Sequence, residues 1–142
     1  MRTVAQILAR KGISVVTVDP STSVIIALKI MADKNIGSVV VMDGQQFLGI
    51  MTERDYSRKV VLKGRSSEHT TVADIMSSEF PNVFPNDDID HCMKLLSAYK
   101  IRYLPVMEKN VLTGIVSIND VVTETILSQH ETISHLQNYI QS

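Results

Sequence analysis

The sequence predicts an α+β fold made of two copies of one unit, related to each other by a pseudo-twofold axis. Residues 20–55 and 85–120 repeat one pattern in register, at a constant offset of 65 and without a gap. A second echo lies upstream at an offset of 68, where residues 3–7 (TVAQI) match residues 71–75 (TVADI). Each copy also contains the apolar periodicity of a helix followed by that of two strands. One such half-domain leaves its sheet uncovered, so the two copies are expected to pack together.

Each copy is expected to begin with a short helix and an extended segment. Thr3 and Thr71 stand before apolar residues at helical spacing, where a hydroxyl can cap a helix N-terminus. The extended segments are predicted at 13–18 and, shorter, at 81–84. A proline then follows each segment, which predicts a turn before the next element.

An amphipathic helix is predicted next in both copies, capped by residues of 21–23 and 86–88. Its apolar positions recur at i, i+3, i+4 and i+7. They are Val24, Ala27, Leu28 and Met31 in the first copy and Ile89, Cys92, Met93 and Leu96 in the second. Because Cys92 takes the place of Ala27, we interpret it as a small buried hydrophobic residue.

A β-hairpin and a second helix complete each copy. Strands are predicted at 38–42 and 47–51, and again at 103–107 and 111–116, with helices starting at Thr52 and Ser117. The unit order is therefore helix–strand–helix–strand–strand–helix. The polar segment 63–70 is the expected linker. The predicted domains are residues 1–64, residues 65–128 and a helical extension at 129–142.

The composition narrows the class of protein. The chain has 142 residues, 44% of them apolar and 20% charged, which is typical of a globular protein. A net charge of −1 argues against binding to nucleic acid or to an anionic membrane surface. No signal peptide or long apolar run is recognised, so a soluble cytoplasmic protein is expected.

Nothing in the sequence predicts catalysis or a metal site. The four histidines and the single cysteine lack the spacing of metal ligands. No nucleophile–base signature such as Gly-x-Ser-x-Gly is present. We therefore expect a protein that is not an enzyme and has neither a catalytic residue nor a metal.

The most specific local pattern is Gly-x-x-[Thr/Ser]-x-x-Asp at the junction of a strand with a helix. It occurs at 49–55 and again at 114–120. One interpretation is a helix cap, in which the hydroxyl and the acid satisfy free backbone N–H groups. The other is a ligand site, in which the acid accepts hydrogen bonds from ribose hydroxyls and the hydroxyl faces a phosphate. Both can hold at once, and Arg54 within the first motif is a candidate phosphate ligand.

These motifs resemble those of a known family. Each is preceded by Ile-x-x-[Val/Leu]-[Val/Pro]-Val, at 36–41 and at 101–106. The combination is similar to a tandem CBS-domain pair, also called a Bateman module, and the likeness covers residues 3–127. The basic stretch after the first motif is similar to that of small stand-alone CBS-pair proteins.

The resemblance implies an adenine-nucleotide sensor, with AMP first among the ligands and NAD, ADP, ATP or S-adenosylmethionine also compatible. Each cleft should lie between the repeats, so that Asp55 faces 80–83 and 101–104 while Asp120 faces 13–16 and 36–39. The expected nucleotide-binding residues are Ser14, Val16, Ile36, Gly37, Ser38, Thr52, Arg54, Asp55, Pro81, Ile101, Arg102, Tyr103, Leu104, Ser117 and Asp120. The repeats differ around these positions, so the two clefts should not bind identically.

The alternative is a dimerisation or interaction module without a physiological nucleotide. A homodimer is expected under either hypothesis. The sensor hypothesis also implies a partner protein that responds to the ligand-induced change. The chain continues past Asp120 without Gly or Pro. Its apolar residues there follow a 4-3 spacing interrupted by Gln129, at Val122, Ile126, Ile133, Leu136 and Ile140. This stripe predicts either a coiled-coil-like seam between two copies or a helix that folds back on its own subunit.

Overall fold

The structure, a computed structural model, describes residues 2–12 and 14–141. They form two compact units that do not follow the order of the chain. Unit 1 combines residues 1–14 with residues 81–142, and unit 2 consists of residues 15–80. The first helix of the chain therefore belongs to the unit formed by the second repeat. The domain limits predicted at 64 and 128 follow the repeat in the sequence, whereas the compact units exchange their N-terminal segments.

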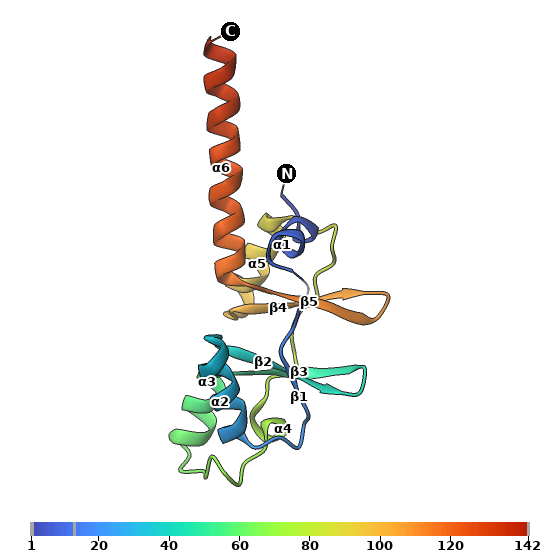
Figure 1. The fold of residues 1–142 in the computed structure, drawn as a ribbon, viewed down its shortest axis with the longest axis vertical. Coiled ribbons are helices and arrows are strands. Elements are labelled where there is room, and N and C mark those ends of the chain that lie inside the picture. Colours follow the sequence, from blue (N-terminus) through green and yellow to red (C-terminus); the bar gives the residue numbers. More distant parts are fainter. Residues whose placement is uncertain (1, 13, 142) are drawn as a thin grey trace. The chain divides into compact units, whose positions relative to one another are not determined.

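Unit 2 contains a three-stranded sheet with helices packed against it (Figure 1). The sheet order is β1-β2-β3, with β1 parallel to β2 and β2 antiparallel to β3. Its elements are β1 (Thr17–Val18), α2 (Val24–Lys34), β2 (Ser38–Asp43), β3 (Gln46–Thr52), α3 (Glu53–Tyr56), the π-helical turn η1 (Ser57–Val61) and α4 (Val72–Ile75).

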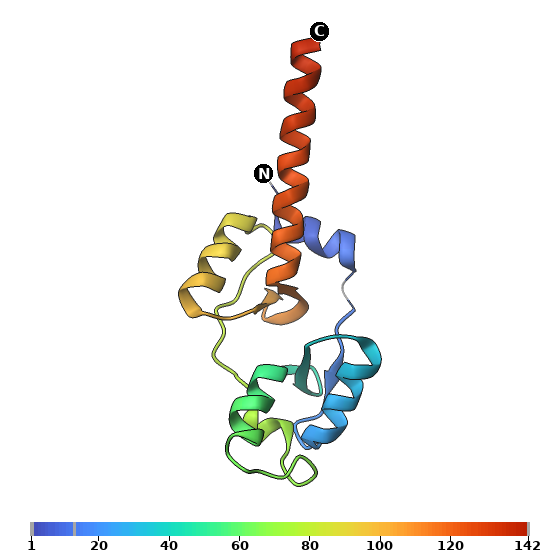
Figure 2. The same cartoon turned by 90° about the vertical axis from the view of Figure 1, so that its left-hand side faces the viewer.

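Unit 1 repeats this plan with a two-stranded sheet and a much longer final helix (Figures 1 and 2). Its elements are α1 (Val4–Lys11), α5 (Ile89–Tyr99), β4 (Tyr103–Glu108), β5 (Val111–Ser117) and α6 (Ile118–Gln141). The predicted hairpins and amphipathic helices are thus confirmed. The predicted caps of α2 and α5 are also present: Ser23 accepts from the N–H of Ile26, and Asp88 accepts from the N–H of His91.

The predicted extended segments are shorter than expected. Of 13–18, Ile13 lies outside the described residues and only β1 pairs as a strand, while Val83 makes a single parallel bridge to Val106. The difference between the repeats has a simple cause. In unit 2 the N–H of Val40 donates to the carbonyl of Val16 at 2.9 Å. Its counterpart is Pro105, which has no N–H to donate, so the ladder in unit 1 shrinks to one bridge.

Each unit has its own apolar core, completed by the short helix that the repeat pattern assigns to the other copy. In unit 2, Val72 and Ile75 of α4 are buried with the stripe of α2 and the hairpin. In unit 1, Val4 and Ile7 of α1 are buried with α5 and the second hairpin, and Cys92 is fully buried among them as predicted. Removing either short helix would expose one face of a core.

The two motif glycines allow the short helices to approach the hairpins. A Cβ on Gly49 would lie 2.6 Å from the carbonyl oxygen of Ser77, the residue that bridges to Ile50 just after α4. A Cβ on Gly114 would lie 2.8 Å from Cδ2 of Leu8 in α1. Packing therefore explains why a glycine stands at the same offset in both repeats.

We predict that Gly49→Ala destabilises the protein more than Gly114→Ala. The added methyl group meets rigid backbone at Gly49 but the end of a leucine side chain at Gly114. Overpacking of this kind typically costs about 1–3 kcal/mol of unfolding free energy. Chemical denaturation of the two variants measures the difference. Equal stabilities would show that contact with the Ser77 carbonyl does not limit the packing of unit 2.

Candidate functional site

Both Gly-x-x-[Thr/Ser]-x-x-Asp motifs form reciprocal helix caps. In unit 2 the backbone N–H and the hydroxyl of Thr52 both donate to Oδ2 of Asp55 at 3.0 Å, and the N–H of Asp55 donates back to Thr52 Oγ1. In unit 1 the N–H of Ser117 donates to Asp120 Oδ2 at 2.8 Å, and the N–H of Asp120 returns a bond to Ser117 Oγ. The capping interpretation is confirmed.

The carboxylate of Asp55 has donors on both of its oxygens. Besides the two bonds from Thr52 to Oδ2, Oδ1 accepts from the hydroxyl of Ser77 at 3.1 Å and lies 3.0 Å from Nζ of Lys59. The same Lys59 ammonium donates to the carbonyl of Ile75 at 2.8 Å. Asp55 is only 8% exposed, so a ribose hydroxyl could reach this carboxylate only if one of these donors moved.

The carboxylate of Asp120 is less fully engaged. Its Oδ2 accepts from Nζ of Lys11 at 2.7 Å, and this lysine also donates to the carbonyl of Ile115 at 2.9 Å. Among the described residues, no donor is found on Oδ1 of Asp120. One oxygen of Asp120 is therefore open to a further hydrogen bond.

The structure places part of each predicted site beside the cap of its own repeat. Ser38 pairs with Thr52 across β2 and β3, and the carbonyl of Gly37 accepts from the N–H of Glu53 at 3.2 Å. Tyr103 likewise pairs with Ser117 across β4 and β5. The carbonyl of Arg102 accepts from the N–H of Ile118 at 2.8 Å. Whether each cap also faces the opposite repeat stays a prediction.

The remaining predicted residues fall into three groups. Ser14, Arg54 and Arg102 are exposed, and Pro81 is half-buried. Three apolar residues are half-buried against the cores of their units: Val16, Ile36 and Ile101. Leu104 is fully buried in the core of unit 1, so only its backbone could contact a ligand.

Comparison with known proteins decides the family. The CBS-domain profile matches residues 3–61 and again residues 72–126. The chain belongs to the CBS-domain family. It carries two CBS domains, which confirms the resemblance recognised in the sequence.

Relatives share the CBS pair at moderate identity. The mitochondrial CBS domain-containing protein CBSX3 of Arabidopsis thaliana is 39% identical over 120 residues; the match covers 81% of this chain but only 58% of the relative. Protein YhcV of Bacillus subtilis is 31% identical over 106 residues, 75% of each chain. The structure of a candidate signal-transduction protein with CBS domains from Burkholderia ambifaria superposes with a TM-score of 0.86 at 45% identity, covering 89% of this chain and 96% of that one.

The lysine beside the capped aspartate comes from a different element in each CBS domain, and the sequence analysis missed this difference. Lys59 in the first domain corresponds to Glu124 in the second, at the offset of 65. Glu124 is fully buried in α6, and its carboxylate lies 2.5 Å from Nε of Arg10 and 3.5 Å from a guanidinium nitrogen of Arg2. In the second domain α1 therefore supplies the cations, including Lys11 at the cap. Two features of the sequence could have indicated this difference. Glu124 stands where the first repeat has Lys59, and Arg10 and Lys11 lie in a first helix that is longer than α4, its counterpart.

Other chemistry finds no support in the part of the chain that the structure describes. No group of three or more His, Cys, Asp or Glu side chains there could hold a metal ion. Of the described helices, none combines the length and the apolar character needed to cross a bilayer. Burial raises the pKa of the Cys92 thiol to about 11, so at neutral pH this group is a protonated core residue rather than a nucleophile.

Proposed function

We propose that this CBS pair is a regulatory protein that binds an adenine nucleotide at its two capped motifs, with AMP as the first ligand to test. The observation that carries the proposal is the recurrence of one carboxylate–lysine pair at both caps, Asp55 with Lys59 and Asp120 with Lys11. A carboxylate can accept from the vicinal hydroxyls of ribose, and an ammonium beside it can attract a phosphate.

A structural neighbour supports an adenosine-bearing ligand. The CBS pair of protein MJ0100 was solved in complex with 5′-methylthioadenosine and S-adenosylmethionine, and it superposes with a TM-score of 0.75 at 24% identity. At that identity the likeness concerns the fold, so NAD, ADP, ATP and S-adenosylmethionine stay beside AMP as candidates. The proposal takes from this neighbour only the adenosine part that the two ligands share.

The two caps should differ in how they admit a ribose. Asp120 can accept a further hydrogen bond on its open Oδ1 without losing a contact. A ribose at Asp55 must displace Ser77 or Lys59 from Oδ1. Binding at Asp55 would therefore loosen the contact between the cap and the end of α4, whereas binding at Asp120 would leave α1 in place.

The alternative function is an interaction module without a nucleotide. The full set of donors on Asp55 favours it, because that carboxylate is satisfied without any ligand. A hexameric CBS-CP12 protein from bloom-forming cyanobacteria, 27% identical, shows that proteins with this domain can assemble. We further propose that this chain forms a homodimer, that it regulates a partner protein and that it is located in the cytoplasm.

We predict that Asp55→Ala and Asp120→Ala each weaken AMP binding at one of the two sites. Loss of the hydrogen bonds from ribose to a charged acceptor should weaken AMP binding at that site by about 1.5–3 kcal/mol. Titration calorimetry with AMP measures the loss, and thermal melting measures the accompanying change in stability. Asp55→Ala should lower the melting temperature more, since it removes the acceptor for three side-chain donors rather than one.

Asp74→Ala is the matched control for these variants. Asp74 caps α4 through Thr71 in the same way but lies outside both motifs. It should change stability without changing AMP binding. If the two motif variants bind AMP like the wild type and only melt earlier, the motifs are caps alone and the proposed site is wrong.

We predict that Arg54→Ala weakens binding of AMP much more than binding of adenosine. Arg54 is exposed next to the capped carboxylate, where its guanidinium can grip a phosphate but has no role for the nucleoside. Arg58→Ala, an exposed cation outside the motif, is the control and should leave both affinities unchanged. An equal loss for AMP and adenosine would remove Arg54 from the phosphate role.

A further inference from the structure

The second half of α6 is exposed along its whole described length. The helix runs from Ile118 to Gln141, and every residue from 129 to 140 is exposed. Both views show this half extending beyond the other elements of unit 1 (Figures 1 and 2). At a rise of about 1.5 Å per residue, the exposed part is about 18 Å long.

The amino acids of this segment do not favour an isolated helix. Ser, Thr, His, Asn and β-branched Ile are weak helix formers, and they fill most positions from 128 to 140. Most helical stability in proteins comes from packing of an apolar face rather than from propensity, so the exposed end of a longer helix frays readily. The segment therefore needs a contact that stabilises its helical form.

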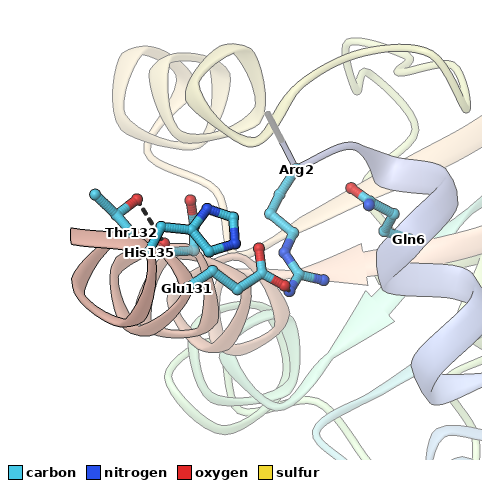
Figure 3. Close-up of a pocket in the computed structure, with 6 residues that line it drawn as sticks. Arg2, Gln6, Glu131, Thr132 and His135 are labelled. Carbon is cyan, nitrogen blue, oxygen red and sulfur yellow. Dashed lines mark hydrogen bonds and ion pairs between the residues drawn. The ribbon is translucent and has the colours of Figure 1, made fainter. Parts of the chain in front are cut away.

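One face of α6 is held by the N-terminal segment of its own unit. Arg2 lies 3.5 Å from the carboxylate of Glu124 and also pairs with Glu131, two turns further along the same face. Figure 3 shows this guanidinium reaching from the segment before α1 to Glu131. Gln6, His135 and neighbouring residues line a shallow pocket of about 250 Å³ beside the pair.

The opposite face carries the apolar stripe. If the three isoleucines at 126, 133 and 140 take heptad position a, then Val122, Gln129 and Leu136 take position d. Glu124 and Glu131 then take position f, on the side of the helix away from the stripe. The apolar members of the stripe are 43–80% exposed, so the alternative in which it folds back on its own subunit does not occur in unit 1.

We propose that α6 pairs with α6 of a second copy of this chain in a parallel two-stranded coiled coil. Isoleucine at a with leucine at d favours two parallel strands, and this seam has three isoleucines at a and Leu136 at one of its d positions. The e and g positions of the seam carry no Lys, Arg, Asp or Glu that would repel an identical helix; they are Thr123, Thr125, His130, Thr132, Gln137 and Tyr139. This pairing does not rest on nucleotide binding.

Gln129 selects the parallel orientation. In a parallel pair in register, Gln129 meets Gln129 of the partner subunit, and the two amides can hydrogen-bond to each other. In an antiparallel pair with the same seam it would face an isoleucine, which leaves a buried amide without a partner. A single polar residue in a seam commonly fixes register and orientation in this way.

Disulfide trapping in the full-length chain tests the orientation. Under mild oxidation Gln129→Cys should form a covalent dimer, because the two sulfur atoms meet only in a parallel, in-register pair. Asn138→Cys, at position f on the outer face, is the matched control and should stay monomeric in denaturing electrophoresis. The native Cys92 is buried and should not contribute. Absence of the Gln129→Cys dimer, or equal trapping at both positions, would overturn the proposal.

The strength of the pairing is tested by sedimentation equilibrium. Leu136→Lys places a charge in the seam and should raise the dimer dissociation constant at least tenfold, whereas Asn138→Lys should leave it unchanged. Deletion of residues 129–142 should weaken the dimer as Leu136→Lys does and leave AMP binding intact. Identical dissociation constants for Leu136→Lys, Asn138→Lys and the wild type would contradict a seam at α6.

Discussion

The close approach of each short helix to a hairpin glycine is the constraint on which the rest of the structure depends. Helix α1 packs over Gly114, and the end of α4 packs over Gly49. Each helix completes the core of its unit, and each also brings a side chain to the capped carboxylate. Lys11 reaches Asp120 from α1, while Ser77 reaches Asp55 from the end of α4. The packing that closes each unit therefore also shapes its candidate site.

The two CBS domains use the same scaffold with different chemistry. In the first domain a lysine on the helix after the cap neutralises Asp55, and Ser77 occupies the rest of its Oδ1. In the second domain the corresponding position is Glu124, and the cation comes from α1 instead. Pro105 likewise removes a backbone donor that Val40 provides. These exchanges make the caps unequal, so a regulatory pair built on them should respond to occupation of one site differently from occupation of the other.

Local and periodic features could be predicted from the sequence, and long-range partners could not. The hairpins, the helices and the caps at Thr52 and Ser117 follow from patterns within a few residues, where the physics of capping and side-chain alternation is local. The link between Lys11 and Asp120 spans 109 residues, and no periodicity indicates it. The exchange of α1 between repeats is equally invisible, because the repeat suggests that each helix stays with its own copy. From the sequence, Glu124 could be recognised only as an acid at the position where the first repeat has Lys59, without its arginine partners.

The central claim is that the two capped motifs are the places where an adenine nucleotide binds. Backbone amide signals of the uniformly ¹⁵N-labelled protein, followed during titration with AMP, test it most directly because they report position as well as affinity. We expect saturable shifts of the amides within 52–55, within 117–120 or within both. No shift at saturating AMP, or shifts confined to residues away from both motifs, would contradict it.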